Sequence, residues 1–256
     1  IRDVERSRGL GDVYKRQAAV AGLKTCGIRG FNLTMPNKNK IVELLDELSP
    51  EAQLIGAVNT VLNDNGKLIG YNTDGYGFMQ SVRDAGHDIT GKNITVMGVG
   101  GASMAICAQS ALDGAASVHI FARRTSRYWN RTQKFAENLS AKTGCQVCLF
   151  DNDDHTALRD SIAQSYLLIN ATSVGMVPDI DDTIIKDTSL FHPELVVADV
   201  VYEPQETRLL REAKAAGCQT FNGMYMLLHQ GAKAFQIWTG QEMPVSVIKE
   251  KYFSVK

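Results

Sequence analysis

The chain has 256 residues, enough to form one large domain or two smaller ones around substantial cores. Its 27 lysine and arginine residues nearly balance its 28 aspartate and glutamate residues, and the resulting net charge of −1 excludes the strong positive field of most nucleic-acid-binding proteins. No stretch is long and apolar enough to span a bilayer, and no secretory signal pattern opens the sequence. Five scattered cysteines, an odd number, indicate a reducing compartment. We therefore expect a cytoplasmic protein without a nucleic-acid or membrane partner.

One pair of cysteines, Cys145 and Cys148, has the C-x-x-C spacing found in zinc and redox sites. No second pair and no nearby histidine completes a zinc site. Both cysteines also lie in an alternating, strand-like run at residues 144–150. We expect no metal, and a redox role remains a weak alternative.

The first third of the chain predicts short elements separated by turns. An amphipathic pattern at residues 41–48 predicts a helix that ends at Ser49-Pro50. Residues 57–62 and 67–70 read as strands, joined by the turn Asn63-Asp64-Asn65-Gly66. A helix is expected from about Tyr76 to Ala85.

The remainder alternates short apolar strands with helices. Strands are predicted at residues 94–97, 117–122, 167–170, 195–201 and 219–221, and helices at residues 102–112, 129–142 and 207–216. Fully apolar short strands between helices are typical of a parallel sheet covered on both faces. The fold class is therefore α/β.

A glycine-rich turn, Gly98-Val99-Gly100-Gly101, stands between a predicted strand and a helix that starts at Ala102. Such a turn lets the backbone approach a pyrophosphate, which the amides and the dipole at the helix start then bind. The pattern departs from G-x-G-x-x-G, because Ser103 stands where the third glycine would be. A strand-to-helix turn without a ligand is the alternative.

The next strand runs into Arg123-Arg124-Thr125, with no acidic residue in reach. NAD-binding folds usually place Asp or Glu there, and a carboxylate would repel the 2′-phosphate of NADP. Two guanidinium groups and a hydroxyl would bind that phosphate, so the sequence favours NADP over NAD. A solvated basic turn is the alternative interpretation.

Lys38 and Asp74 each lie in a segment crowded with hydroxyl and amide side chains, at residues 30–38 and 70–78. Oxidation of an alcohol needs a base within hydrogen-bond reach of the hydroxyl, and a lysine amine beside an aspartate can serve as that base. Lys38 could instead be an exposed lysine before a helix, although a helix start is unfavourable for a cation. Asp74 could simply cap the helix after Thr73.

Several segments, in this order, resemble the shikimate dehydrogenase family over about residues 18–256. Those segments are Asn32 to Lys38, Gly56 to Thr60, Tyr71 to Gly75, Gly98 to Ala102, Asn170 to Met176, Tyr202 to Pro204, Gly223 to Gln230 and Trp238 to Gly240. Met35 to Lys38 and Met226 to Ala232 look most like the bacterial quinate/shikimate dehydrogenase branch. That branch often has an acid at the position of Thr125, so the threonine favours NADP without excluding NAD.

The resemblance implies two α/β domains: a catalytic domain, and a Rossmann-type domain built on a doubly wound parallel sheet. Residues 18–79 would form a truncated catalytic domain, residues 80–225 the dinucleotide-binding domain, and residues 226–256 closing helices that return to the catalytic domain. The reaction would be reversible NADP-linked reduction of 3-dehydroshikimate to shikimate in aromatic amino-acid biosynthesis, with quinate as a second candidate substrate, by a monomer or homodimer. By similarity, Lys38 and Asp74 are catalytic, and Thr34, Asn59 and Gln230 bind substrate. The cofactor would be lined by Val99, Gly100, Gly101, Ala102, Arg123, Arg124, Thr125, Ser173, Tyr202 and Gly223.

The start of the sequence departs from the family. Relatives open with a strand and a serine-containing loop that binds the substrate carboxylate, whereas residues 1–17 are a charged stretch that resembles nothing in the family. We expect these residues to be foreign and the catalytic domain to be truncated. A dinucleotide-binding module without turnover is therefore the alternative function.

Overall fold

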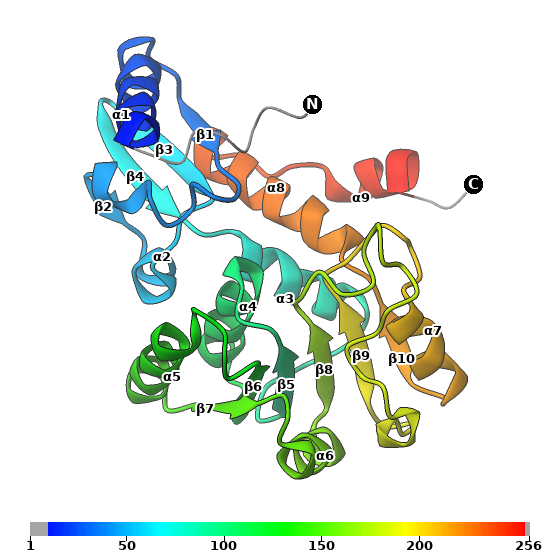
Figure 1. Cartoon of the computed structure of the whole chain (residues 1–256). Helices are drawn as coiled ribbons and strands as arrows, with labels where there is room; N and C mark the ends of the chain where they lie inside the picture. Colours follow the sequence, from blue (N-terminus) through cyan, green and yellow to red (C-terminus); the bar gives the residue numbers. More distant parts are fainter. Residues whose placement is uncertain (1–9, 254–256) are drawn as a thin grey trace. The chain divides into compact units, whose positions relative to one another are not determined.

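The structure, a computed structural model, describes residues 10–253 (Figure 1). The chain divides into two compact units: unit 1 holds the described residues through Asn72 together with Ala234–Gln241, and unit 2 holds Thr73–Lys233 with the described residues from Glu242 onward. The chain passes from one unit to the other after Asn72, after Lys233 within the last long helix, and after Gln241. Helix α1 (Leu10–Thr25) runs through residue 17, where the sequence suggested a junction, and residues 1–9 of that segment lie outside the described residues.

Unit 1 is built on a four-stranded sheet in the order β1 (Gly30–Asn32), β3 (Thr60–Asp64), β4 (Lys67–Tyr71) and β2 (Glu47–Leu48). Strands β3 and β4 form the predicted hairpin, in which Asn65 and Gly66 have φ angles of 52° and 91°. Both residues are of the types that tolerate a positive φ. The core of the unit packs α1 against the sheet through Val20, Ile41, Ala52, Val58, Val61 and Leu68.

The predicted helix at residues 41–48 is wrong. Only a 3₁₀ turn, η1 (Val42–Leu44), forms there, and β2 follows it. Glu47 and Leu48 pair with β4, and the amide of Leu68 donates to the Asp46 carboxylate at 2.7 Å, so strand pairing overrides the helical pattern. Ser49 does not end a helix but caps the next one, α2 (Pro50–Ile55), by accepting from the amide of Ala52 at 3.2 Å.

Unit 2 is built on six parallel strands, as predicted. Their order is β10 (Gln219–Phe221), β9 (Val196–Asp199), β8 (Leu167–Asn170), β5 (Asn93–Met97), β6 (Ser117–Ala122) and β7 (Gln146–Asp151). From β5 the chain proceeds first to β6 and β7, and then returns to place β8 on the other side of β5. This reversal makes the sheet doubly wound, with a switch point between β5 and β8, where ligands bind in such folds.

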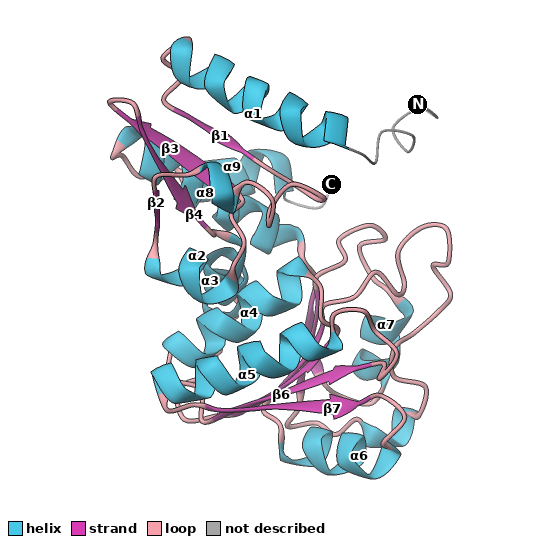
Figure 2. Ribbon diagram, turned by 60° about the vertical axis from the view of Figure 1, so that its left-hand side comes forward, coloured by secondary structure: helices cyan, strands magenta, loops and turns pink. Residues whose placement is uncertain are grey.

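Helices cover both faces of this sheet. Figure 2 shows α3 (Asp74–Asp84), α4 (Gly101–Leu112) and α5 (Trp129–Thr143) on one face, and α6 (His155–Gln164) and α7 (Arg208–Ala215) on the other. Helix α6 was not expected from the sequence; Asp154 caps it by accepting from the amide of Ala157 at 2.9 Å. A short 3₁₀ turn, η2 (Thr188–Leu190), precedes β9.

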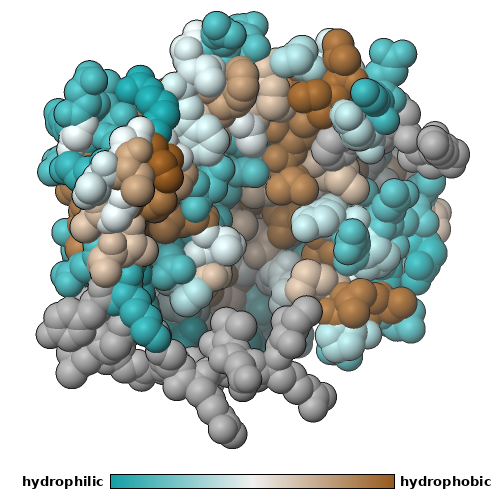
Figure 3. All heavy atoms as spheres, turned by 90° about the horizontal axis from the view of Figure 1, so that it is seen from above, coloured by the Kyte–Doolittle hydropathy of each residue, from teal (hydrophilic) through white to brown (hydrophobic). Residues whose placement is uncertain are grey.

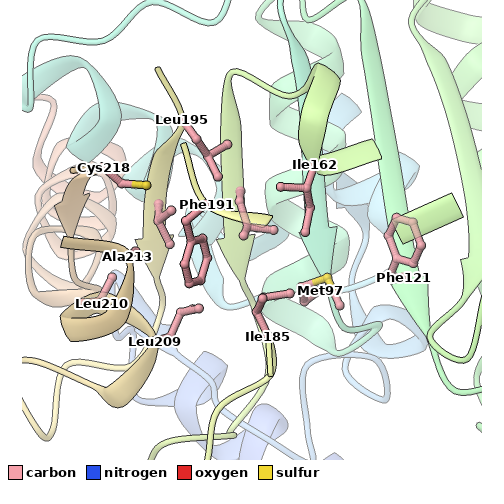
Figure 4. Packing of buried hydrophobic residues seen from close by; sticks show 12 residues of the cluster. Met97, Phe121, Ile162, Ile185, Phe191, Leu195, Leu209, Leu210, Ala213 and Cys218 are labelled. Atoms are coloured by element: carbon pink, nitrogen blue, oxygen red, sulfur yellow. The ribbon is translucent and has the colours of Figure 1, made fainter. Parts of the chain in front are cut away.

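The core beneath α6 and α7 is apolar and closely packed (Figure 4). Phe121 and Leu168 of the strands belong to one buried cluster with Ile162 of α6, Leu209 of α7 and Phe191. Burial of these side chains contributes about 1.5–3 kcal/mol for each large residue. The rigid sheet that results fixes the loops at its carboxyl edge.

The chain closes with α8 (Met224–Thr239), α9 (Val245–Ile248) and the π-helical turn η3 (Lys249–Phe253). None of the described helices is long and apolar enough to cross a membrane. On the face drawn in Figure 3, brown apolar residues form separate groups among teal hydrophilic ones.

Candidate active site

In unit 1, Lys38 lies in a series of turns after β1. The amide of Asn37 donates to the carbonyl of Thr34 at 2.9 Å, and the amide of Val58 donates to the carbonyl of Lys38 at 2.8 Å. Lys38 is half-buried and Thr34 is exposed. These backbone bonds hold the Lys38 turn against the segment that precedes β3.

The same segment carries Asn59, whose side chain is buried. Its Oδ1 accepts from the Thr60 hydroxyl at 3.0 Å, and its carbonyl accepts from the Asn32 side chain at 3.1 Å. Because Val58 bonds to Lys38, the fold brings Asn59 to the Lys38 turn. The structure thus gathers Thr34, Lys38 and Asn59, all predicted from sequence, within unit 1.

In unit 2, Asp74 is the first residue of α3 and is 6% exposed. A carboxylate there interacts favourably with the helix dipole. The two glycines that follow it allow close packing, since a Cβ on Gly75 would lie 2.3 Å from the carbonyl oxygen of Ala105 on α4. A Cβ on Gly77 would lie 2.7 Å from the amide nitrogen of Gln230 on α8. Unit 2 therefore presents Asp74 and Gln230 from two helices in backbone contact.

A cavity of about 1510 Å³ opens at the carboxyl edge of the unit 2 sheet. It lies at the switch point, because its lining includes Gly98, Val99 and Gly100 after β5 and Ala171 to Val174 after β8. Gly98 has a φ of +110°, and a Cβ there would lie 2.8 Å from the Thr172 methyl group. Only glycine fits this turn.

The glycine turn suits a bound dinucleotide. A Cβ on Gly100 or Gly101 would meet no heavy atom of the described chain within 4 Å, so space for a ligand is open above the turn. Helix α4 starts there without a side-chain cap and without an acidic residue in its first turn. Its first amides and its positive dipole end are therefore available to a pyrophosphate.

The basic turn after β6 divides between two environments. Arg123, Thr125 and Arg127 line the cavity, whereas the Arg124 guanidinium lies over the Trp129 ring at 4.6 Å from its centroid. Ser173 also lines the cavity. Gly101, Ala102, Arg124, Tyr202 and Gly223 are outside the described lining, although all belong to unit 2.

Several residues of this edge were not predicted from sequence. The cavity is also lined by Asn152, His155, Arg159 and Lys186, which follow β7 or lie in loops without a motif. Asn170, although it opens one of the family segments, and Asp199 were not singled out as functional residues, and both are buried at the ends of β8 and β9. A polar residue closing each of two neighbouring apolar strands was the signal that could have found this pair.

In the part of the chain that the structure describes, no metal-binding cluster includes Cys145 and Cys148. Among the described residues no group of three or more His, Cys, Asp or Glu side chains is placed to hold a metal ion. All five cysteines are free thiols, and burial raises the pKa of Cys145 to about 11, which makes it a poor nucleophile.

A doubly wound sheet defines a Rossmann-type dinucleotide-binding fold when a glycine turn at its switch point leads into a helix without a side-chain cap, as it does here at α4. Comparison with known proteins identifies the family. Residues 12–61 match the shikimate dehydrogenase substrate binding domain, and residues 223–251 match the shikimate 5′-dehydrogenase C-terminal domain. The chain belongs to the shikimate dehydrogenase family.

Individual relatives support the assignment of the chain to this family. Shikimate dehydrogenase (NADP(+)) of Listeria innocua is 51% identical over 91% of this chain and 80% of its own length, and quinate/shikimate dehydrogenase of Escherichia coli is 42% identical over 91% and 81%. A crystal structure of the Listeria monocytogenes enzyme in complex with shikimate and NAD is 49% identical and superposes with a TM-score of 0.90, covering 93% of this chain and 82% of that one.

Proposed function

We propose that this chain is a shikimate dehydrogenase that catalyses the reversible NADP-linked reduction of 3-dehydroshikimate to shikimate, with quinate as a second candidate substrate. The observation that carries the proposal is the open glycine turn at the switch point of unit 2, in a chain of this family. A dinucleotide bound there would supply the two-electron acceptor and donor.

Lys38 and Asp74 are the proposed catalytic pair. During oxidation of shikimate the Lys38 amine accepts the proton of the hydroxyl group, and during reduction its ammonium returns a proton to the forming alcohol. The Asp74 carboxylate is proposed to accept a hydrogen bond that orients the substrate hydroxyl. The hydroxyl of Thr34 and the amides of Asn59 and Gln230 bind the remaining polar groups of the substrate.

The proposed cofactor residues form three groups. The amides of Val99, Gly100, Gly101 and Ala102 bind the pyrophosphate at the start of α4. Arg123 and Thr125, which line the cavity, would bind the 2′-phosphate, and Arg124, whose guanidinium lies over the Trp129 ring, would contact the adenosine. Ser173, Tyr202 and Gly223 approach the cofactor from the loops after β8, β9 and β10.

Absorbance at the reduced-nicotinamide band tests this function, with shikimate and quinate each offered with NADP and with NAD. Lys38→Ala should reduce turnover by about a hundredfold to ten-thousandfold while NADP binding persists, since general-base catalysis typically contributes about 10²–10⁴-fold. Lys40→Ala, which changes an exposed lysine two residues away, is the matched control. Unchanged turnover in Lys38→Ala would reject the catalytic role. Binding of NADP by the unmodified chain without any turnover would instead indicate a binding module.

The free cysteines support a cytoplasmic location. We propose a monomer or homodimer, which size-exclusion chromatography with light scattering would test. A larger assembly would contradict that proposal.

A further inference from the structure

Helices α3 and α8 contact each other at three places within unit 2. The Lys233 ammonium of α8 lies over the Tyr76 ring of α3, 5.0 Å from its centroid. The next residue of α3, Gly77, lies against the backbone of α8 at Met226 and Gln230. Near the end of α3, Oδ2 of Asp84 lies 2.8 Å from His229 Nε2.

The Asp84–His229 contact is largely removed from solvent. The His229 side chain is 7% exposed and that of Asp84 is 23% exposed. A histidine buried to this extent needs a hydrogen-bond partner, because an unpaired ring nitrogen would be costly. Loss of the contact would therefore shift the helix rather than leave the ring in place without a partner.

The carboxylate of Asp84 collects donors from three elements. Besides His229 of α8, it accepts from the Gln80 side-chain amide at 3.2 Å on its own helix and from the Lys249 ammonium of η3. Lys249 also lies over the Tyr225 ring, 4.1 Å from its centroid. The start of α8 is thus attached to α3 both directly and through η3.

These contacts fix how α8 is rotated. A glycine contact alone sets the distance between two helices but leaves one of them free to rotate or slide. His229 precedes Gln230 directly, so their side chains project about 100° apart around the helix. A ring bonded to Asp84 therefore fixes the direction in which the Cα–Cβ bond of Gln230 projects, and the Gln230 side-chain amide donates to the Leu227 carbonyl of the same helix at 3.2 Å.

We propose that Asp84 and His229 form a positioning pair that orients Gln230 for the substrate. This inference rests on the proposed role of Gln230. The pair does not touch the substrate; it sets the rotation of α8 relative to α3, the helix that begins with Asp74.

Two substitutions at His229 test the pair. His229→Leu fills the space with an apolar side chain that cannot donate to Asp84, and should raise KM for shikimate about tenfold, the size expected if Gln230 loses a hydrogen bond to the substrate. His229→Gln places an amide nitrogen near the former Nε2 and should restore KM to within about threefold of the original. Calorimetry should show the same changes in the shikimate Kd and no more than about a twofold change in the NADP Kd.

If His229 had a merely structural role, His229→Leu would lower Tm and reduce kcat, without changing KM for shikimate. Gln230→Ala and the double variant separate the two cases: once Gln230 is truncated, His229→Leu should have little further effect on KM. His192→Leu removes another histidine–carboxylate pair of unit 2, with Nδ1 3.2 Å from Glu194, and is the control for loss of such a pair.

An unchanged KM in His229→Leu, or equal defects in the leucine and glutamine variants, would overturn the positioning role while leaving the proposed function intact. Additive effects of the two substitutions would also overturn it. Absence of shikimate binding and turnover in the unmodified chain would overturn the proposed function itself.

Discussion

Asn170 and Asp199 are joined side by side at the carboxyl ends of β8 and β9, with Asn170 Nδ2 donating to Asp199 Oδ1 at 3.0 Å. Asp199 has no exposed surface, and burial raises the pKa of its carboxyl group although three donors oppose that shift. Besides Asn170, those donors are the amide of Val201 at 2.9 Å and the hydroxyl of Thr207 at 2.8 Å. One buried carboxylate thus organises the loop that carries Tyr202.

Asn170 organises the neighbouring loop in the same way. Its Oδ1 accepts from the amide and the hydroxyl of Thr172, at 3.1 and 2.6 Å, and its Nδ2 also donates to the carbonyl of Val174 at 3.1 Å. These bonds fold the loop around Ser173, which lines the cavity. The pair is therefore the scaffold for two loops of the proposed cofactor site.

Asn170→Ala should lower the free energy of unfolding by about 2–3 kcal/mol, because it leaves several buried polar groups without partners. It should also weaken NADP binding, because the loop around Ser173 loses its internal bonds. Urea unfolding and calorimetric titration measure the two effects. Asn93→Ala removes an asparagine at the opposite, amino edge of the sheet, where it bonds Gln164 and Ser117, and should spare NADP binding. An equal loss of NADP binding in both variants would contradict the scaffold role.

Gly100→Ala should separate folding from ligand binding. An added methyl group meets no described heavy atom within 4 Å, and the φ of −79° is accessible to alanine, so Tm should change little. The same methyl group would occupy the space proposed for the pyrophosphate, so we expect NADP binding to weaken by at least about tenfold.

Gly22→Ala is the control for a glycine with equally open surroundings, on α1 in unit 1. It should stabilise the helix by about 0.5–1 kcal/mol and leave NADP binding unchanged. Undiminished NADP binding in Gly100→Ala would show that the dinucleotide does not approach this turn.

The sequence predicted unit 2 well because short apolar strands and helical stretches there alternate with clear turn signals. Its six strands and the helices at α4, α5 and α7 form close to the expected ranges. Unit 1 was harder. Residues 41–48 have helical periodicity, but the chain places Glu47 and Leu48 beside β4, and local pattern cannot reveal pairing with a strand some 20 residues away.

Prediction of the candidate site from the sequence has the same limit, because local patterns do not reveal contacts between distant residues. Motifs located Gly98, Lys38 and Asp74, because glycine turns and ionisable residues in polar segments are visible in sequence. Two adjacent arginines look alike in sequence, yet Arg123 lines the cavity while Arg124 stacks on Trp129. Asp84 and His229 are 145 residues apart, and only the packing of α3 on α8 brings them together.

Thr125→Asp should shift cofactor preference from NADP toward NAD. Thr125 lines the cavity beside Arg123, and a carboxylate there would repel the 2′-phosphate and accept hydrogen bonds from a ribose hydroxyl. NADP binding should weaken by about 10–100-fold, as expected for like charges in contact, while NAD binding holds or improves. Fluorescence titration with both dinucleotides measures the change, and Thr125→Ser, which keeps the hydroxyl, is the control. Parallel losses for NADP and NAD would place the 2′-phosphate elsewhere.

The carboxyl group of Asp84 supports a prediction for acid stability. Burial alone would raise its pKa, but the hydrogen bonds from Lys249, His229 and Gln80 outweigh burial and lower the pKa below its ordinary value of 3.8. A carboxyl group whose pKa is lower in the folded state stabilises the fold when charged. That stabilisation is fully present above pH 3.8 and is lost as the pH falls through the lower, folded-state value.

Asp84→Asn should therefore lower the free energy of unfolding by about 1 kcal/mol near neutral pH, the size expected for a partly exposed ion pair. The difference between the two proteins should stay constant down to about pH 5 and shrink below about pH 4, because the original carboxylate becomes protonated there. Urea unfolding across this range measures it, with Asp160→Asn, an exposed carboxylate on α6, as the control. A difference that persists undiminished into acid would mean that the charge of Asp84 contributes nothing, and that shape alone joins α3 to α8.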